Sequence, residues 1–456
     1  MKLPKIKINQ KTKYIKISQE IDFFELFQKI EQNFNNCFIF ESLGEEGKFS
    51  RYSVMGFDPD HIISARGSNL IIDSKVFKVK NPYFALREIM PTANMSKDYA
   101  GGLVGYMSYE ALNYFESNPK VKIHKYFDQF MFGVYSDGLI LDKLTGELVY
   151  FYHNLNRINL VKKVIASKIK NKKLKISFTR DSLSKKEYAQ IVGKVKKHII
   201  NGNTFQCEVG FKNEYSISGD ALQIYKNLRT INPSPFMYYL KFCDKKIIGA
   251  SPELLFSLRN DEMTTKPLAG TIKRGKDEKE DQYLARTLLN NPKERAEHMM
   301  LVDMHRNDIG KVARFGSVKI RDLMNVKKFS HVQHISSEVV GLIKSDEDMF
   351  SSLASNFPVG TVSGTPKIET IKIIDSNEPE ARGPYGGGVG CFGFNGDCTF
   401  ALTIRSIFIY GKNDREKAYT QTSGGIVYDS EIDKEYEEIE RKLSAMKKAL
   451  QIFLSV

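Results

Sequence analysis

The chain has 456 residues, a hydrophobic fraction of 41%, a charged fraction of 27% and a formal net charge of +14. The length exceeds what one core usually serves, and the composition is that of a globular protein, which excludes a fibrous or largely disordered chain. No apolar run of about eighteen residues predicts a membrane helix. The basic N-terminal stretch lacks the apolar core of a secretory signal, so we expect neither export nor a membrane partner.

The positive charge raises the question of nucleic-acid binding. Lysines are spread through the chain, with local runs at 2–16 and 162–186, and aromatic residues do not alternate with them as in a base-stacking platform. We therefore expect a lysine-rich surface and no nucleic-acid partner. The cysteines are scattered without a CxxC pair, which favours reduced thiols in the cytoplasm: Cys37, Cys207, Cys243, Cys391 and Cys398.

The first 165 residues predict one amphipathic helix, at 21–34, followed by short strands. A lysine-rich crossing then suggests a boundary between a domain at 1–165 and a domain at 180–456. The expected strands are CFIFES (37–42), RYSVMGFDP (51–59, after a turn), HIISARG (61–67), NLIIDSKVFKV (69–79), GGLVGYMSYEAL (101–112) and 130–153, with a hairpin at Thr145-Gly146.

The second segment mixes helices with strands that do not alternate as βαβ units, so the fold class is α+β and the strands are antiparallel. Helices are expected at 184–201, 221–231, from Pro292 to about 310, and at 433–454. Strands are expected at 204–215, at GASPELLFSL (249–258) and at TFALTIRSIFIY (399–410).

Two helices each carry a pair of glutamates. Glu294 and Glu297 are three residues apart, so they lie on one face of their helix, and two acids on one face make half of a magnesium site. Glu435, Glu438 and Lys442 sit at the edge of the apolar stripe of the terminal helix. Spacing alone favours solvated helix faces at both places.

The glycine-rich run 386–396 contains a literal GxGxxG, but apolar residues alternate within it and Asn395-Gly396 is a turn signal. A dinucleotide fingerprint needs a following helix, so we reject that interpretation. Glycines in paired strands allow a ligand to approach the backbone, with Arg405 and Tyr385 as carboxylate partners.

Two further residues are candidates for proton transfer. Glu253 starts an apolar strand, where burial would raise its pKa and suit a proton donor. His334 lies at the rim of an expected strand, where a structural role is the commoner outcome for a single histidine.

Ordered motifs then make the chain resemble the chorismate-utilising enzymes, and among them the large subunits of anthranilate synthases. The resemblance is strong from 184 to 450, and it rests on PLAGT (267–271), AEHMMLVD (296–303), RND (306–308), SHVQHI (330–335), PVGTVSGTPK (358–367), RGPYGGGVG (382–390), IRS (404–406) and the final ExxExxxK (435–442). It implies two large antiparallel β-sheets packed as a sandwich-like core with helices outside.

The resemblance also implies roles for the residues already singled out. Mg²⁺ would sit among Glu294, Glu297, Glu435 and Glu438. The implied catalytic residues are Glu253, which protonates the departing hydroxyl, His334, which serves the later elimination, Gln206 and Thr271. The implied substrate-binding residues are Thr361, Tyr385, Gly386, Gly387, Arg405, Gly424, Gly425 and Lys442.

Two positions distinguish the subfamilies. Gln206 stands where isochorismate and salicylate synthases have a lysine base, and Ala269 stands where aminodeoxychorismate synthases have a nucleophilic lysine. The resemblance therefore implies addition of ammonia to chorismate and loss of pyruvate, with the ammonia supplied from glutamine by a separate amidotransferase subunit in a heterotetramer. Aminodeoxychorismate or aminodeoxyisochorismate synthesis is the alternative, and a non-catalytic nucleic-acid-binding relative is a remote one.

The first segment resembles the regulatory domain of anthranilate synthases. L-Tryptophan would bind as a feedback inhibitor between FIFES and NPSPFMYY, lined by Glu41, Ser42, Pro235, Phe236 and Met237. The chain also departs from the usual family pattern at Glu208, Gly210, His305, Thr365 and at Thr422-Ser423. None of these departures removes a catalytic group, and Ser423 is expected to alter the site that holds the substrate carboxylate.

Overall fold

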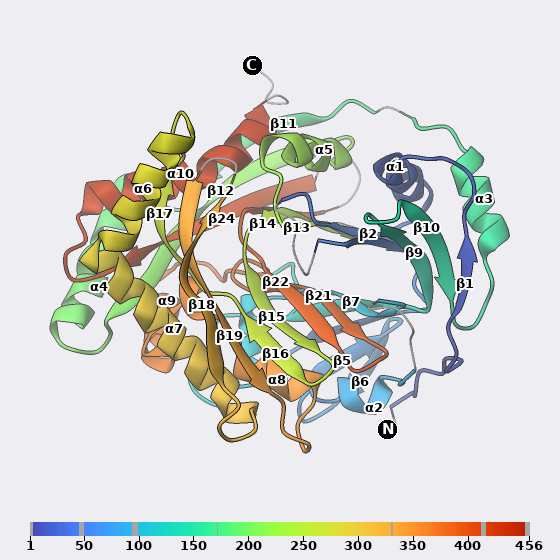
Figure 1. The fold of residues 1–456 in the computed structure, drawn as a ribbon, viewed down its shortest axis with the longest axis horizontal. Coiled ribbons are helices and arrows are strands. Elements are labelled where there is room, and N and C mark those ends of the chain that lie inside the picture. The colour runs from blue at the N-terminus through green and yellow to red at the C-terminus, as the bar shows by residue number, and fades with distance from the viewer. Residues whose placement is uncertain are drawn as a thin grey trace.

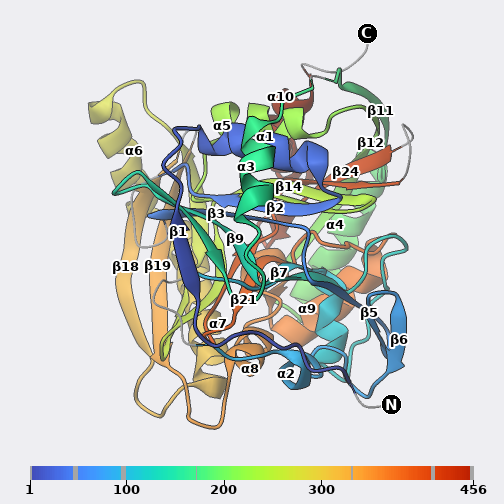
Figure 2. The same ribbon diagram turned by 90° about the vertical axis from the view of Figure 1, so that its right-hand side faces the viewer.

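A computed structural model of the protein describes residues 3–44, 50–93, 99–170, 172–329, 332–411 and 416–451. The turn expected before Arg51 and the first two residues of SHVQHI lie partly or wholly outside these ranges. The described chain forms two antiparallel β-sheets that face each other, with helices on their outer sides (Figures 1 and 2). The predicted α+β class and the two-sheet architecture are confirmed.

The first sheet has twelve strands. Its order is β1 (Lys13–Lys16), β10 (Glu147–Tyr152), β9 (Asp137–Asp142), β3 (Tyr52–Phe57), β2 (Asn36–Glu41), β13 (Phe236–Phe242), β14 (Lys245–Ser251), β23 (Ser406–Tyr410), β24 (Glu416–Ile426), β12 (Gln206–Ser218) and β11 (Lys175–Asp181), with β20 (Gly364–Thr365) also paired to β12.

The second sheet also has twelve strands. Its order is β17 (Leu268–Lys273), β19 (Val332–Leu342), β16 (Glu262–Thr265), β15 (Leu254–Arg259), β22 (Cys398–Leu402), β21 (Gly388–Gly393), β7 (Gly102–Met107), β8 (Phe130–Tyr135), β4 (His61–Arg66), β5 (Asn69–Ile72) and β6 (Lys75–Lys78), with β18 (Lys319–Lys328) also paired to β19.

Helices cover the outer face of each sheet. The apolar faces of α1 (Phe23–Asn33), α3 (Ile158–Ala166), α5 (Leu222–Ile231) and α10 (Ile432–Gln451) share one core with the first sheet. The helices α2 (Leu86–Ile89), α7 (Pro292–Val312), α8 (Met349–Ser355) and α9 (Lys367–Asn377), with the 3₁₀ turns Tyr109–Tyr114 and Gly360–Val362, share a core with the second. The remaining helices are α4 (Lys185–Ile200) and α6 (Glu278–Asn290).

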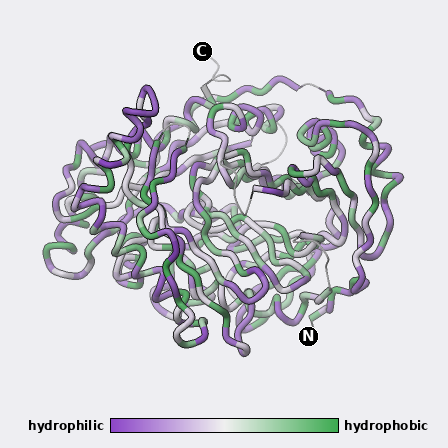
Figure 3. Tube along the Cα trace, viewed as in Figure 1, coloured by the Kyte–Doolittle hydropathy of each residue, from purple (hydrophilic) through white to green (hydrophobic). Residues whose placement is uncertain are grey.

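A third core lies between the sheets and is built from both. Phe38 and Phe408 of the first sheet contribute to it together with Tyr106 and Val389 of the second. Apolar residues follow the central strands, and polar residues follow the outer helices and loops (Figure 3). A fourth core packs α4, α9 and α10 against β12 and β24. Burial of apolar surface in these four cores therefore stabilises the packing of the sheets and helices.

Several elements form where their local sequence predicts them. The side chain of Asn291 caps α7, and Pro292 occupies its first turn. Ser184 and Glu187 form a reciprocal capping box at the start of α4. The run with GxGxxG forms β21, paired antiparallel to β22 and β7, so rejection of the dinucleotide fingerprint is confirmed.

Three expected strands are wrong as continuous elements. The stretch 249–258 breaks between β14, which ends at Ser251 in the first sheet, and β15, which begins at Leu254 in the second. The stretch 101–112 ends as a strand at Met107 and continues as the 3₁₀ turn Tyr109–Tyr114. The stretch 399–410 is not continuous, because β22 ends at Leu402 in the second sheet and β23 begins at Ser406 in the first. Arg405, within the crossing, has a positive φ of 51°, a conformation that a strand residue does not adopt. Apolar residues precede and follow the crossing, so the sequence pattern predicts one continuous strand and gives no indication of the break.

The segments 1–165 and 180–456 are hydrogen-bonded to each other in both sheets. Strand β2 pairs with β13 in the first sheet, and β7 pairs with β21 in the second. The division into two domains stays a prediction, and the pairing shows that neither segment has a sheet of its own.

Candidate active site

Two neighbouring crossings between the sheets place an acid beside a guanidinium. The chain passes from β14 to β15 through Glu253 and from β22 to β23 through Arg405. The crossings are hydrogen-bonded, since Leu402 N donates to Glu253 O at 3.0 Å and Ala250 N donates to Arg405 O at 3.1 Å. Glu253 and Arg405 are thus brought together although 152 positions separate them in the sequence.

Glu253 is placed to hold a proton. Its side chain is buried, with 4% of its surface exposed, and Thr361 Oγ1 donates to its Oε1 at 2.8 Å. Burial raises the pKa of Glu253 to about 8, although the Thr361 hydrogen bond and Arg405 oppose the rise. The carboxyl is therefore largely protonated at neutral pH.

His334 and Thr271 face each other across β19 and β17. His334 Nδ1 lies 3.0 Å from Gly270 O and 3.1 Å from Thr271 Oγ1. A carbonyl only accepts hydrogen bonds, so Nδ1 carries the proton and Nε2 is the basic nitrogen. Burial lowers the pKa of His334 to about 4, so the ring is neutral at pH 7 and Nε2 can accept a proton.

The predicted carboxylate-binding residues meet around Ser423 of β24. Lys442 Nζ donates to Ser423 O at 3.0 Å, and the hydroxyls of Tyr385 and Ser423 lie 2.8 Å apart. Gly424 and Gly425 continue the same strand. Backbone hydrogen bonds of 3.0 Å from Gly386 N to Thr403 O and from Thr403 N to Gly387 O tie the glycine-rich run to the crossing that carries Arg405.

Gln206 lies at the start of β12, beside Gly425. A Cβ built on Gly425 would lie 2.5 Å from Gln206 Nε2 and 2.7 Å from Glu208 Oε1, so a larger residue there would collide with both side chains. Gln206 Oε1 is buried and has no hydrogen-bond partner in the described ranges. Ala269, which lacks an amine, lies half-buried on β17.

The four predicted metal ligands come from opposite sides of the site. Glu294 and Glu297 lie on α7, which packs against β17 and β19, and Glu435 and Glu438 lie on α10, which packs against β24. All four are half-buried. The charge of Glu438 raises the pKa of both glutamates on α7, so the two pairs influence each other across the site.

The pKa values show where negative charge is in excess. Burial, together with Glu294, raises the pKa of Glu297 to about 7, and burial also raises the pKa values of Glu294 and Glu435. Burial has the same tendency at Glu438, but its 2.8 Å ion pair with Lys442 holds the pKa of Glu438 below its usual range. Lysine charge thus balances one of the four acids far better than the other three.

The chemistry of these residues fits a hard divalent cation, because carboxylate oxygens are the ligands that Mg²⁺ prefers and a cation would relieve the excess charge. The ligand set is not already gathered. Within the described part of the chain, no three acidic, histidine or cysteine side chains converge as a metal site. Binding would therefore require the glutamate side chains to turn toward one another.

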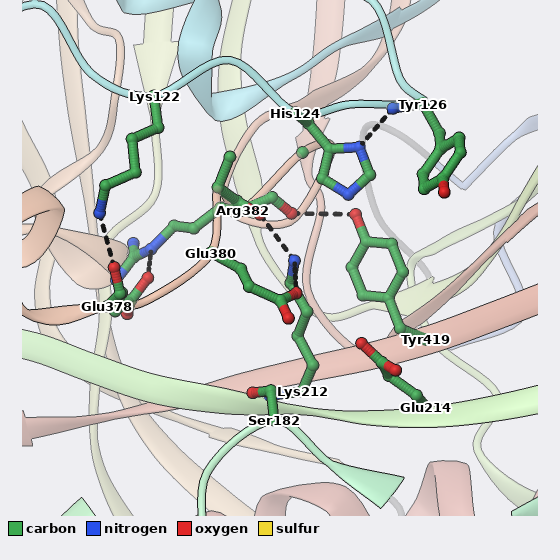
Figure 4. A network of polar contacts seen from close by, with 12 residues as sticks. Lys122, His124, Tyr126, Ser182, Lys212, Glu214, Glu378, Glu380, Arg382 and Tyr419 are labelled. Carbon is green, nitrogen blue, oxygen red and sulfur yellow. Dashed lines mark hydrogen bonds and ion pairs between the residues drawn. The ribbon is translucent and has the colours of Figure 1, made fainter. Parts of the chain in front are cut away.

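A buried arginine, Arg382, makes hydrogen bonds to segments that carry residues of the site. The guanidinium of Arg382 is 2% exposed and donates to both carboxylate oxygens of Glu378, at 2.7 and 2.8 Å, to Val362 O and to Glu208 O. Figure 4 shows Arg382 directed at Glu378, with Tyr419 donating to the Arg382 carbonyl. These contacts fix the start of the RGPYGGG run and hence the position of Tyr385.

The predicted inhibitor residues form a separate group in the first sheet. Met237 pairs with Glu41 across β13 and β2, strands that β14 and β23 separate from β24. Glu41 accepts hydrogen bonds from Tyr225 at 2.9 Å and from Arg229 at 3.0 and 3.1 Å. The buried Ser42 hydroxyl has no partner among the residues described. Pro235 and Phe236 are half-buried at the start of β13.

Sequence reasoning missed the part played by Glu208 and Arg382. Glu208 is 6% exposed, and its carboxylate accepts a hydrogen bond from Ser423 Oγ at 2.7 Å. Its position gave a usable signal, because Gln206 and Glu208 are two apart on a strand and must share a face. Glu208 and Ser423, both expected departures from the family pattern, are joined by this hydrogen bond.

The arrangement is that of an enzyme acting on a small anionic molecule, because a buried acid lies beside a guanidinium and a lysine lies among the candidate carboxylate-binding residues. A family model described as chorismate binding enzyme matches residues 15–448. The chain therefore belongs to the chorismate binding enzyme family.

Individual relatives refine the comparison. The anthranilate synthase component 1 of Leptospira biflexa is 51% identical over 458 residues, covering 99% of this chain and 98% of that protein. The aminodeoxychorismate synthase component 1 of Bacillus subtilis is 34% identical over 462 residues, covering 95% and 96%. The crystal structure of anthranilate synthase component I from Streptococcus pneumoniae matches with a TM-score of 0.79 at 29% identity, covering 88% of this chain and 93% of that one.

No helix in the described ranges is both long and apolar enough to cross a membrane.

Proposed function

We propose that this enzyme is the large subunit of an anthranilate synthase. It would convert chorismate and ammonia to anthranilate, pyruvate and water, the first committed step of tryptophan biosynthesis, as a lyase. The observation that carries the proposal is the buried, protonated Glu253 beside Arg405, in a site that has no amine at Ala269 or Gln206. Relatives of both kinds match over nearly the whole chain, and the one of higher identity is an anthranilate synthase component.

The first step uses Glu253 as a general acid. Its proton passes to the hydroxyl that leaves chorismate, while ammonia adds to the ring. Gln206 has no basic nitrogen, so it cannot activate water as a lysine would, which favours ammonia over water as the nucleophile. Covalent capture of the ring at position 269 is excluded, because alanine has no nucleophile.

The second step removes pyruvate. It requires a base for the ring proton, and we assign that role to the unprotonated Nε2 of His334, although burial lowers its basicity. Thr271 and the Gly270 carbonyl hold Nδ1 and so fix the orientation of the ring. Tyr385, Lys442 and Arg405 would hold the substrate carboxylates throughout.

Glu294, Glu297, Glu435 and Glu438 would hold Mg²⁺, and their excess negative charge supports this assignment. When bound, the ion would supply Lewis-acid polarisation of the ring carboxylate. Glu438 also pairs with Lys442, so substrate binding and metal binding would share one ion pair.

We further propose a cytoplasmic enzyme with a glutamine amidotransferase partner. Burial raises the pKa values of Cys37, Cys207, Cys391 and Cys398, which disfavours the thiolate that a glutaminase needs, and the exposed Cys243 has its Sγ 3.5 Å from Asn36 Oδ1. Feedback by L-tryptophan at Glu41 and Ser42 is supported by the buried hydroxyl of Ser42, which has no hydrogen-bond partner within the described part of the chain. Aminodeoxychorismate or aminodeoxyisochorismate synthesis remains the second candidate, favoured by the Bacillus relative.

Product analysis tests the proposal. Purified protein is incubated with chorismate, MgCl₂ and ammonium chloride, and products are separated by chromatography. Anthranilate and pyruvate in equal amounts are expected. Accumulation of aminodeoxychorismate or aminodeoxyisochorismate without pyruvate would establish the alternative. Repeating the incubation with glutamine, with and without a candidate amidotransferase subunit, tests the partner.

A further inference from the structure

Three buried side chains form one chain of hydrogen bonds at the substrate site. Tyr385 and Ser423 are each 3% exposed, and Glu208 is 6% exposed. The Tyr385 hydroxyl lies 2.8 Å from Ser423 Oγ, and Ser423 Oγ donates to Glu208 Oε2 at 2.7 Å. The same Ser423 accepts a hydrogen bond from Lys442 through its carbonyl. Ser423 therefore contacts two of the three candidate carboxylate-binding side chains, Tyr385 and Lys442, and also Glu208.

The donor and acceptor in each hydrogen bond of this series follow from the number of hydroxyl protons available. A serine hydroxyl has one proton, and Ser423 gives it to Glu208. Tyr385 must then be the donor in its own contact with Ser423, which leaves its hydroxyl proton unavailable to a substrate. If Glu208 gains a proton, it can donate to Ser423, Ser423 can donate to Tyr385, and the Tyr385 proton is free.

We propose that Glu208 and Ser423 are positioning residues that act through Tyr385 on the substrate carboxylate. Binding of the anionic substrate takes one proton from solvent onto Glu208, which reverses the chain and turns the Tyr385 hydroxyl toward the substrate. One O–H bond forms at Glu208 and one O–H bond of a solvent hydronium breaks, while Ser423 and Tyr385 keep their own hydroxyl protons and only rotate, so the remaining changes are exchanges of hydrogen bonds. The inference rests on the proposed function, since it takes the substrate to be chorismate.

Charge and burial make proton uptake at Glu208 accessible. Burial raises the pKa of Glu208, although Lys442 and Ser423 oppose the rise. Arrival of another carboxylate near Glu208 would raise its pKa further, because like charges that lie close together repel. The charged and titratable groups facing Glu208 are Lys442 and Glu438 from α10, Arg382, Tyr385 and Glu378 from the loop before β21, Glu253 from the crossing, Tyr188 from α4 and Cys207 on its own strand.

The first test compares the KM for chorismate in the wild type and in Glu208→Gln between pH 6 and 9. A glutamine side chain is neutral at every pH, so this variant takes up no proton at position 208, and its amide N–H can donate to Ser423 as a protonated carboxyl would. The ratio of wild-type KM to variant KM is expected to rise with pH by about tenfold, the worth of one hydrogen bond to a charged group. Taking the ratio cancels titrating groups that Glu208 does not influence, among them Glu297. Glu208 raises the pKa of Glu253, so the titration of Glu253 is followed separately in the pH profile of kcat of each protein. The effect should appear in KM more than in kcat.

A double-mutant cycle separates a relay from a simple charge effect. Ser423→Ala removes the hydroxyl that links Tyr385 to Glu208 but leaves the charge of Glu208 in place. If the relay operates, the effects of Glu208→Gln and Ser423→Ala on KM are not additive. Glu31→Gln is the matched control, since Glu31 is also buried and accepts from the hydroxyl of Tyr239 at 3.0 Å. Its KM ratio should not change with pH.

The outcomes distinguish the inference from the function. Wild-type turnover with a pH-independent KM ratio refutes the relay and leaves the proposed function standing, as do strictly additive effects in the cycle. A wild-type protein that turns over no chorismate overturns both. The wild-type pH profile needs no variant, and a profile in which KM falls as pH rises would also refute the relay, whether or not the variants fold.

Discussion

Replacement of Thr361 by valine tests whether Glu253 is the proton donor. Burial raises the pKa of Glu253 from 4.5 to about 8, so at pH 7 about ten carboxyls are protonated for each one that is ionised. With a pKa of 4.5, only about one in 300 would be protonated. Activity, measured as kcat/KM for chorismate, should therefore stay level up to about pH 8 and fall above it.

The hydroxyl of Thr361 favours the ionised form, because it donates to Oε1 at 2.8 Å. A hydrogen bond to a charged group contributes about 1.5–3 kcal/mol, which corresponds to about one to two pH units. Thr361→Val should raise the pKa of Glu253 and move the falling limb of kcat/KM to higher pH by about one unit. Glu253→Gln, which cannot donate this proton, should lose about 10²–10⁴-fold in kcat.

The same pKa has a consequence for stability. A carboxyl whose folded pKa is raised contributes fully to stability below its unfolded pKa, and that contribution is lost as pH rises toward the folded pKa. For Glu253 the loss between pH 4.5 and pH 8 is roughly 4 kcal/mol. Glu253→Gln should lack this loss, so its free energy of unfolding should exceed that of the wild type more at pH 8 than at pH 5.

The assay is initial-rate formation of anthranilate from pH 6 to 10, with urea unfolding at the two pH values. Thr265→Val is the matched control, because this buried threonine has no hydrogen-bond partner for its hydroxyl in the described ranges. An alkaline limb that stays in place in Thr361→Val, or that moves equally in Thr265→Val, would refute the assignment of that limb to Glu253.

Three other changes test the metal, the nucleophile and the regulatory group. Glu297→Gln should reduce turnover at least about 100-fold and abolish any thermal stabilisation by MgCl₂, which in the wild type should grow as pH rises through about 7, where Glu297 ionises; wild-type turnover would contradict the four-glutamate site. Gln206→Lys should yield some isochorismate by chromatography, and an unchanged product pattern would show that the base position is not shared. Arg229→Leu leaves the buried Glu41 without its ion pair, so urea unfolding should show a loss of about 3–5 kcal/mol, and a loss below about 1 kcal/mol would contradict the pairing.

Hydrophobic periodicity and turn signals correctly predicted the terminal helix and one β-hairpin, because both depend on residues close together in the sequence. The terminal helix has its apolar stripe where the period of three and four residues places it: Ile439, Leu443 and Met446 are fully buried. Glu435 and Glu438 lie at the rim of that stripe, as predicted, and are half-buried. The hairpin at Thr145-Gly146 joins β9 to β10 in register.

Non-local pairing could not be predicted from these rules. Strand β2 has its neighbour β13 some 200 positions later, and the apolar alternation of the two strands fits many other partners. The same limitation hid the link between Glu208 and Ser423. In the sequence, each residue was only an expected departure from the family pattern. The register of β12 against β24 sets Gly210 opposite Ser423 and Glu208 opposite Gly425, and this register brings the two side chains together.

The crossing at Arg405 explains why the missed break matters for function. A strand that continued through 399–410 would keep this residue within one sheet, with its backbone groups paired on both sides. Instead the chain leaves the second sheet after Leu402, and the positive φ of Arg405 allows the turn into the first sheet. Glu253 lies on the adjoining crossing, so its carboxyl is buried between the sheets rather than on an outer face. The burial that raises the pKa of Glu253 therefore results from the sheet topology. A change that restores a continuous strand at 403–405 should expose the Glu253 carboxyl and move the guanidinium of Arg405 away from it.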